Sequence, residues 1–338
     1  MKAISYKLWI ADRNYPLVPW VDMPSAMHLI LLFASAVLLA WLIYNPQNKS
    51  VIIAALLTES ITILGDQNRL QPWHYQYLFT FFAIVANYKY KKKVLQGIVL
   101  ITVATYLFSG LQKINSGFLR TIWSVHLLRR FLGVPEHIIH NRLVHFAGLI
   151  IPLIEVSGAM GLLFLRTMKP AAWLLISMHI FILIFIGPLN FNYNMVVWPW
   201  NVQMILLLYF LFLKEKLILH QTTFRSIPNY IIAWCWIVLP IAGLFGYWDK
   251  FLSAGMYSGR EKLLQFYFAD STQIPTELKP YAFYSKKNTS AGIVLTDWCL
   301  KELNVAAVTE PRVVNSITQQ MNERYAARHI RFELTERH

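Results

Sequence analysis

Long apolar runs alternate with short polar connections over the first 248 residues of the chain. A helix needs about 20 residues to cross the apolar core of a bilayer. Six runs come close to or reach this length: 26–44, 94–111, 143–165, 170–189, 196–213 and 229–248. Two shorter, more polar runs, 51–65 and 73–88, are expected to pair as a helical hairpin around residues 66–68. The pattern therefore predicts an all-α polytopic membrane bundle of about eight transmembrane helices.

Three segments depart from this pattern. Residues 1–25 mix Trp9, Pro16, Pro19 and Trp20 with scattered charges, which is typical of an interfacial segment lying on a membrane. Residues 115–142 have apolar positions at helical spacing, but arginines interrupt any span, so we expect amphipathic helices on the outer face of the 26–248 bundle. Residues 249–338 predict a small soluble α+β domain, with strands at 263–268 and 329–335 and helices at 294–303 and 311–326.

The composition supports membrane insertion, because only 14% of the 338 residues are charged and 56% are hydrophobic. A net charge of +14 would point to nucleic acid in a soluble protein. Here the basic residues gather in the short loops at 89–93, 166–169 and 214–216, so we expect no nucleic-acid partner. The positive-inside rule assigns these loops to the cytoplasm. We therefore expect a multi-pass protein of the cytoplasmic (inner) membrane, with its C-terminal domain periplasmic.

Ionisable residues within the apolar runs are candidates for function, because a charge in hydrocarbon is unfavourable. They are Glu59, Lys113, Glu155 and His179, with His74 at the outer mouth of its run. The structural alternative is that they pair with one another or extend to the interface. For Glu155 the expected partners are His145, Lys113 and His179.

Lys113 is the strongest catalytic candidate. Gly110, Ser109 and Tyr106 precede it by three, four and seven residues and so share its helical face. Small neighbours would leave room for a ligand, and a desolvated lysine can lose its proton and act as a base. The alternative is a lysine anchored at the outer interface.

Amides and aromatic residues gather on the expected outer side. They are Gln71 and Trp73 beside His74, and Asn192 and Asn194 after the sixth run. Together they would line a pocket suited to an isoprenoid quinone or another lipid with a polar head. The two cysteines, Cys235 and Cys299, lie on opposite sides of the last membrane boundary, so we expect neither a disulfide nor a metal site.

A family resemblance rests on the run Tyr-Leu-Phe-Ser-Gly-Leu-Gln-Lys-Ile-Asn at 106–115, the histidines His74 and His179, and Gly-Tyr-Trp-Asp at 246–249. In this order the segments from about 66 to 267 resemble the vitamin K-dependent γ-glutamyl carboxylase family. Its bacterial relatives are the horizontally transferred transmembrane (HTTM) domain proteins. The resemblance implies a menaquinone-like quinone or hydroquinone as cofactor and Lys113 as its base. The family's stretch that holds the substrate glutamate reads differently here, and the large propeptide-binding domain is replaced by about ninety residues.

The residue pattern and the resemblance together give expected roles to three groups of residues. The catalytic group is Lys113, His74 and His179, and the cofactor-binding group is Tyr106, Gly110, Gln71, Trp73, Asn192 and Asn194. The group on the substrate side is Tyr247, Trp248, Asp249, Tyr257 and Arg260.

The preferred hypothesis is a membrane enzyme that deprotonates a quinol-like lipid and acts on a periplasmic protein or peptide at the C-terminal domain. A second hypothesis is a non-enzymatic membrane scaffold or assembly factor, in which the buried charges only pair helices. A neighbouring possibility is a DoxX-like component of quinone-coupled oxidation. A small-solute transporter is least favoured, because the chain has no repeated halves.

Overall fold

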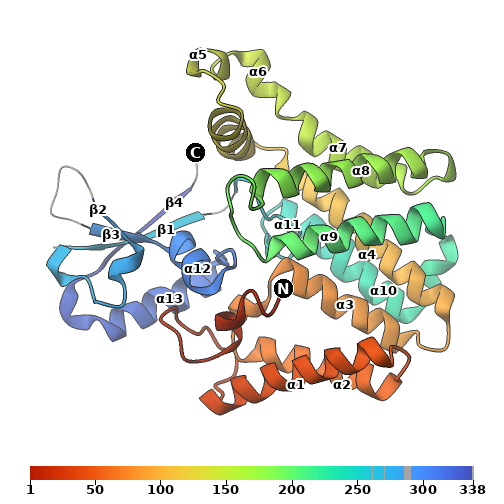
Figure 1. Cartoon of the computed structure of the whole chain (residues 1–338), viewed down its shortest axis with the longest axis horizontal. Coiled ribbons are helices and arrows are strands. Elements are labelled where there is room, and N and C mark those ends of the chain that lie inside the picture. Colours follow the sequence, from red (N-terminus) through yellow and green to blue (C-terminus); the bar gives the residue numbers. More distant parts are fainter. Residues whose placement is uncertain (261, 270, 285–290, 337–338) are drawn as a thin grey trace.

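The computed structural model describes residues 1–260, 262–269, 271–284 and 291–336. It consists of a helical bundle with a small sheet domain against one end (Figure 1). The longer helices of the bundle are α1 (Ser25–Tyr44), α2 (Lys49–Leu64), α3 (Pro72–Ala86), α4 (Lys91–Lys113), α7 (Ile150–Gly161), α8 (Leu165–Ile186) and α9 (Val197–Leu208). Its shorter or non-α helices are η1 (Tyr6–Trp9), η2 (Gln67–Arg69), η3 (Phe118–Phe131), α5 (Glu136–Ile139), α6 (Arg142–Ala147), η4 (Tyr209–Lys214), η5 (Gln221–Arg225), α10 (Ile227–Ala233), η6 (Trp234–Val238) and α11 (Leu239–Leu244).

Six helical stretches in the described part of the chain are long and apolar enough to cross a membrane. They are α1, α4, α8, the continuous pair α6–α7, α9 with η4, and α10 to α11 through η6. The predicted count of eight is not confirmed, because α2 and α3 have only 16 and 15 residues. At 1.5 Å per residue they extend about 24 Å, short of the roughly 30 Å apolar core of a bilayer. They nevertheless form the predicted hairpin, joined through η2.

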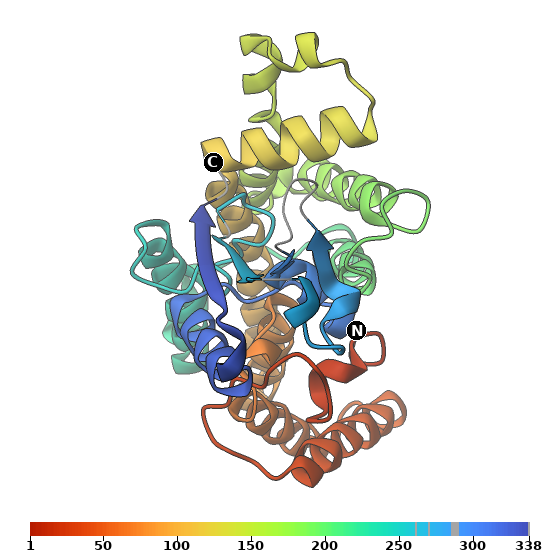
Figure 2. The same cartoon turned by 90° about the vertical axis from the view of Figure 1, so that its left-hand side faces the viewer.

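Helix α4 is the central helix of the bundle, and most of its residues are buried against α3, α7 and α10. Helix α1 is at the opposite extreme, since large apolar side chains such as Phe33 and Ile43 are more than 70% exposed. An apolar outer face and a close-packed interior are what lipid surroundings require. The amphipathic segment predicted at 115–142 is helical, and Figure 2 shows η3 across the upper part of the molecule, with α5 and α6 beyond it.

The sheet domain contains β1 (Lys262–Phe268), η7 (Ser271–Gln273), η8 (Lys279–Tyr281), β2 (Ala282–Tyr284), β3 (Ala291–Val294), α12 (Leu295–Leu303), α13 (Pro311–Arg324), η9 (Ala326–Arg328) and β4 (Arg331–Glu336). Its strands are antiparallel in the order β2-β3-β1-β4. The predicted strands at 263–268 and 329–335 and both predicted helices are confirmed, with shifts of a few residues at their ends. Strands β2 and β3 were not predicted, because three or four residues are too few to show an alternating pattern.

The N-terminal strap, defined here as residues 1–18, lies between the bundle and the sheet domain (Figure 1). The segment 1–25 is expected from its sequence to lie on the membrane, but Leu8, Trp9 and Tyr15 are at most 1% exposed and lie inside the protein, whereas Trp20 is 47% exposed. The three buried residues share one hydrophobic core with Trp73 of α3 and with the sheet domain. Leu8, Trp9 and Tyr15 therefore fill the junction between the two parts.

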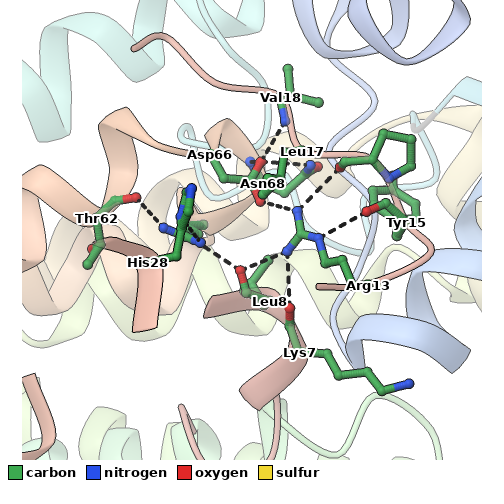
Figure 3. A network of polar contacts seen from close by, with 12 residues as sticks. Lys7, Leu8, Arg13, Tyr15, Leu17, Val18, His28, Thr62, Asp66 and Asn68 are labelled. Carbon is green, nitrogen blue, oxygen red and sulfur yellow. Dashed lines mark hydrogen bonds and ion pairs between the residues drawn. The ribbon is translucent and has the colours of Figure 1, made fainter. Parts of the chain in front are cut away.

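A buried polar network fixes the strap to the turn between α2 and α3 (Figure 3). Arg13 pairs with Asp66, whose Oδ1 also accepts a hydrogen bond of 3.1 Å from the Val18 amide. The Arg69 guanidinium donates to the Leu8 carbonyl oxygen at 3.0 Å and to Thr62 O at 2.9 Å. Burial lowers the pKa of Arg69 to about 10, so its charge is retained at neutral pH. Each buried charge thus has a strap or helix-end partner.

Candidate functional site

A cavity of about 90 Å³ lies among α4, α8 and α9, near the end of the bundle that meets the sheet domain. The segment that follows α11 closes it with Ala254, Met256 and Tyr257. Most of its wall is apolar, with Met178 and Ile182 as examples. Its polar groups are Lys113, Glu155, Ser109, Thr105, Tyr106, His179 and Asn201. An apolar chamber with a few convergent polar groups is typical of a small-molecule site.

Lys113 forms a buried ion pair at one side of this cavity. Its Nζ lies 2.7 and 2.8 Å from the two carboxylate oxygens of Glu155 and 2.6 Å from Ser109 Oγ. An ammonium has three protons to donate, and these three contacts use them all. Lys113 is 9% exposed and Glu155 only 3%, so each charge depends on the other for neutralisation. Of the three partners expected for Glu155, the structure selects Lys113.

Gly110 has a different role from the one expected for it. A Cβ atom at Gly110 would lie 2.7 Å from Val156 Cγ2 and 2.8 Å from the Pro152 carbonyl oxygen. The missing side chain therefore makes room for α7 and none for a ligand. Close contact between α4 and α7 is what brings the Glu155 carboxylate within hydrogen-bond distance of Lys113.

Tyr106, His179 and Asn201 form a directed chain of hydrogen bonds on the other side of the cavity. Asn201 Nδ2 donates to the Val197 carbonyl at 2.8 Å, so its Oδ1 is the acceptor that faces His179 Nδ1 at 2.6 Å. His179 Nδ1 must then carry a proton. In the neutral ring Nε2 accepts, and the Tyr106 hydroxyl donates to it at 2.6 Å. An oriented histidine that accepts from a hydroxyl is the usual arrangement for acid–base chemistry.

His74 does not join Lys113 and His179, contrary to the expectation of one catalytic group. Pro72 lines the cavity and Gln76 contacts Trp200 and Met204, which line it too. His74 lies midway between Pro72 and Gln76 in sequence and therefore on the opposite face of α3. There its Nε2 is 2.9 Å from Glu59 Oε2. Lys113 with Glu155 and Glu59 with His74 are therefore two separate clusters.

The predicted cofactor-binding amides and Trp73 lie outside the cavity. Gln71 Nε2 donates to the carbonyls of Asn68 and Ala306, and Trp73 packs edge-on against Trp9 at 6.0 Å between ring centroids. Asn192 and Asn194 line a second, wider hollow of about 530 Å³ beside the strap and α12. None of these four residues lines the Lys113 cavity.

Of the residues expected on the substrate side, only Tyr257 reaches the cavity, and its hydroxyl accepts a hydrogen bond of 2.7 Å from Asn194. Asp249 forms an ion pair of 2.7 Å with Arg312 of α13. Arg260 Nη1 lies 3.4 Å from Gln112 Oε1. Trp248 packs at the edge of the bundle core, while Tyr247 is 86% exposed. Asp249 therefore links the segment after the bundle to the sheet domain, whereas Trp248 and Arg260 contact the bundle.

Sequence reasoning missed Asn201, although it is the residue that orients His179. Its signal was an amide inside the apolar run 196–213, which the neighbouring tryptophans obscured. Among the described residues, no three His, Cys, Asp or Glu side chains gather closely enough to hold a metal ion.

Comparison of the chain with family models, with curated proteins and with solved structures gives no significant match.

Proposed function

We propose that the protein is a membrane enzyme that binds the hydroxylated ring of a quinol-like lipid in the Lys113 cavity and removes a proton from it. The observation that supports this most is the presence of two polar groups in one apolar cavity. One is the Lys113–Glu155 pair and the other is the Tyr106–His179–Asn201 chain. The family resemblance at 106–115 points to the same chemistry.

The proposed proton transfer uses Glu155 as well as Lys113. An ammonium cannot accept a proton, so Lys113 must first transfer one to the carboxylate that lies 2.7 Å away. The two neutral groups that result are tolerated in a low-dielectric site better than isolated charges. The neutral amine can then take the proton of a ligand hydroxyl and become the ammonium that stabilises the new oxyanion.

Tyr106 would hold the ligand hydroxyl in place. Its own proton is directed to His179 Nε2, so the lone pairs on its oxygen are free to accept a hydrogen bond from the ligand. Asn201 keeps the imidazole in the tautomer that this requires. A cavity of about 90 Å³ is smaller than the usual 300–1,000 Å³ of ligand pockets. Binding of a whole ring therefore requires the covering segment with Ala254 and Tyr257 to move outward.

The test compares purified wild type with Lys113→Arg and Tyr106→Phe in nanodiscs. Lipid extraction and mass spectrometry show whether a quinone co-purifies, and absorbance of an added short-chain hydroquinone shows whether its anion forms. We expect Lys113→Arg to bind the hydroquinone without forming the anion, because a guanidinium does not give up a proton in proteins. Tyr106→Phe should bind more weakly, by a factor of about 5–10 for one lost hydrogen bond. Anion formation that is equal in Lys113→Arg and wild type would refute the proposal.

A scaffold without catalysis is the second candidate, and one observation favours it. Both buried clusters, Lys113 with Glu155 and Lys2 with Glu59 and His74, are fully paired and join different helices or segments. Such pairs can serve to fix the arrangement of helices. A protein that binds no hydroquinone, and retains its cellular role when both Lys113 and Glu155 are replaced, would be a scaffold.

A further inference from the structure

The second buried cluster of charges joins the N-terminal strap to helices α1, α2 and α3. Lys2 Nζ donates hydrogen bonds to both carboxylate oxygens of Glu59 of α2, at 2.7 and 2.6 Å. Ser35 of α1 donates to Oε1, and His74 Nε2 lies 2.9 Å from Oε2. The side chains of Glu59 and His74 are 0% exposed. No part of the Lys113 cavity is involved, so the cluster stands apart from the proposed function.

The two contacts of the His74 ring are incompatible with a neutral imidazole beside an ionised Glu59. Nδ1 lies 2.9 Å from the carbonyl oxygen of Arg69, which can only accept, and Nε2 faces the Glu59 carboxylate. A neutral imidazole has one donor and one acceptor, so it satisfies one of these contacts and sets a lone pair against oxygen in the other. One added proton, on the ring or shared with Glu59, satisfies both.

We propose that Glu59 and His74 together bind one proton inside the bundle, and that docking of the N-terminal strap depends on it. With this proton every contact of the cluster has a donor and an acceptor. Lys2 donates to Ser35 and to both Glu59 oxygens, and the ring donates to Glu59 and to Arg69.

The surrounding groups act in both directions on the bound proton. The Lys2 ammonium opposes a further positive charge, as does burial. The Glu59 carboxylate favours it. His28 faces Arg69 Nη2 at 2.8 Å, and the Tyr77 ring stacks on His74 at 6.0 Å between centroids. Because Lys2 already pairs with the Glu59 carboxylate, the proton is held chiefly by the two hydrogen bonds of the ring.

Loss of the proton is coupled to the strap through two contacts. Trp9 of the strap packs edge-on against the His74 ring at 5.0 Å between ring centroids. The backbone carbonyl of Arg69 accepts a hydrogen bond from His74 Nδ1, and the Arg69 guanidinium donates one to the Leu8 carbonyl of the strap. When the ring becomes neutral it must turn away from Glu59 or from Arg69. Either movement disturbs a residue that fixes the strap, so deprotonation should loosen residues 1–18.

Nitrogen-15 NMR of His74 in the full-length protein tests the bound proton directly. Trp73-His74 is the one Trp-His step in the sequence, so labelling Trp carbonyl carbon and His nitrogen identifies this residue among ten histidines. We expect both ring nitrogens to carry protons while the strap is docked, or one proton to be shared with Glu59. Raising the pH from about 5 to about 9 should remove it. A ring with one protonated nitrogen and an ionised Glu59, with the strap still docked, would overturn the proposal.

Hydrogen exchange of residues 1–18, followed by mass spectrometry over the same pH range, tests the coupling. Beyond the intrinsic pH effect, exchange should accelerate about tenfold or more as the proton leaves, since hydrogen bonds to charged groups are lost. In His74→Gln and Glu59→Gln this transition should be absent. The matched control is His140→Gln, which changes an exposed histidine and should keep it. If the Gln variants fail to fold, the wild type alone tests the coupling: the NMR and exchange transitions should occur at the same pH. Exchange that shows no transition over this pH range would refute the coupling.

Discussion

The Lys113–Glu155 pair can be disrupted one charge at a time and then removed as a whole. Lys113→Met leaves a carboxylate that is 3% exposed without the ammonium that lies 2.7 Å from it. Removing one partner of a buried pair costs about 3–5 kcal/mol, whereas replacing both with apolar residues is often close to neutral. We expect Lys113→Met and Glu155→Leu each to lower the free energy of unfolding by about 3–5 kcal/mol. The double variant should lose less free energy of unfolding than either single variant.

The measurement is a double-mutant cycle, with unfolding in nanodiscs followed by tryptophan fluorescence. The cycle isolates the interaction between the two side chains from their separate contributions. The control cycle is Arg129 and Glu136, which pair at 2.6 Å but are 47% and 54% exposed. A pair in such surroundings should show a coupling below about 1 kcal/mol.

Additive effects at Lys113 and Glu155, with a coupling as small as that of the control, would refute the ion pair as a buried interaction. The double variant also separates the two candidate functions. Its bundle should fold, so an enzyme would lose hydroquinone deprotonation while a scaffold would keep its role.

Three further predictions concern packing, pH and topology. Gly110→Ala should destabilise the bundle by about 1–3 kcal/mol in the same unfolding assay, because its methyl group meets the Pro152 carbonyl at 2.8 Å. Burial opposes ionisation of Glu302, but hydrogen bonds from Tyr281, the Asn14 amide and Lys7 outweigh it, so its pKa is lowered. Its contribution is therefore present above the usual glutamate pKa of about 4.3 and lost as the pH falls through the lowered value. The difference in free energy of unfolding between wild type and Glu302→Gln should therefore vanish below the lowered pKa. A difference that stays constant with pH would contradict this. In a cysteine-free background, a membrane-impermeant thiol reagent added from outside should label Asn192→Cys but not Lys92→Cys. Labelling of Lys92→Cys alone would mean that the protein has the opposite orientation in the membrane.

Much of the candidate site was foreseeable as a set of residues. An ionisable group in an apolar run is visible in sequence, and Lys113, Glu155 and His179 do lie around one cavity. Their grouping with His74 was not foreseeable. It depends on which face of α3 points toward α9, and that is decided by the packing of Gln76 against Trp200 and Met204. Gly110 shows the same limit, since a missing side chain reads equally as space for a ligand or for a neighbouring helix.

The sequence by itself determined the helices, the main strands and the amphipathic segment, because these follow from the spacing of apolar residues along a short stretch of chain. Only the tertiary structure decided the place of residues 1–18. Their tryptophan and charges match a membrane interface as well as a buried strap. The partners that bury them, Asp66, Arg69 and the sheet domain, lie about fifty to three hundred residues away in sequence. Contacts over such separations depend on the folded arrangement of both parts, which no local pattern encodes.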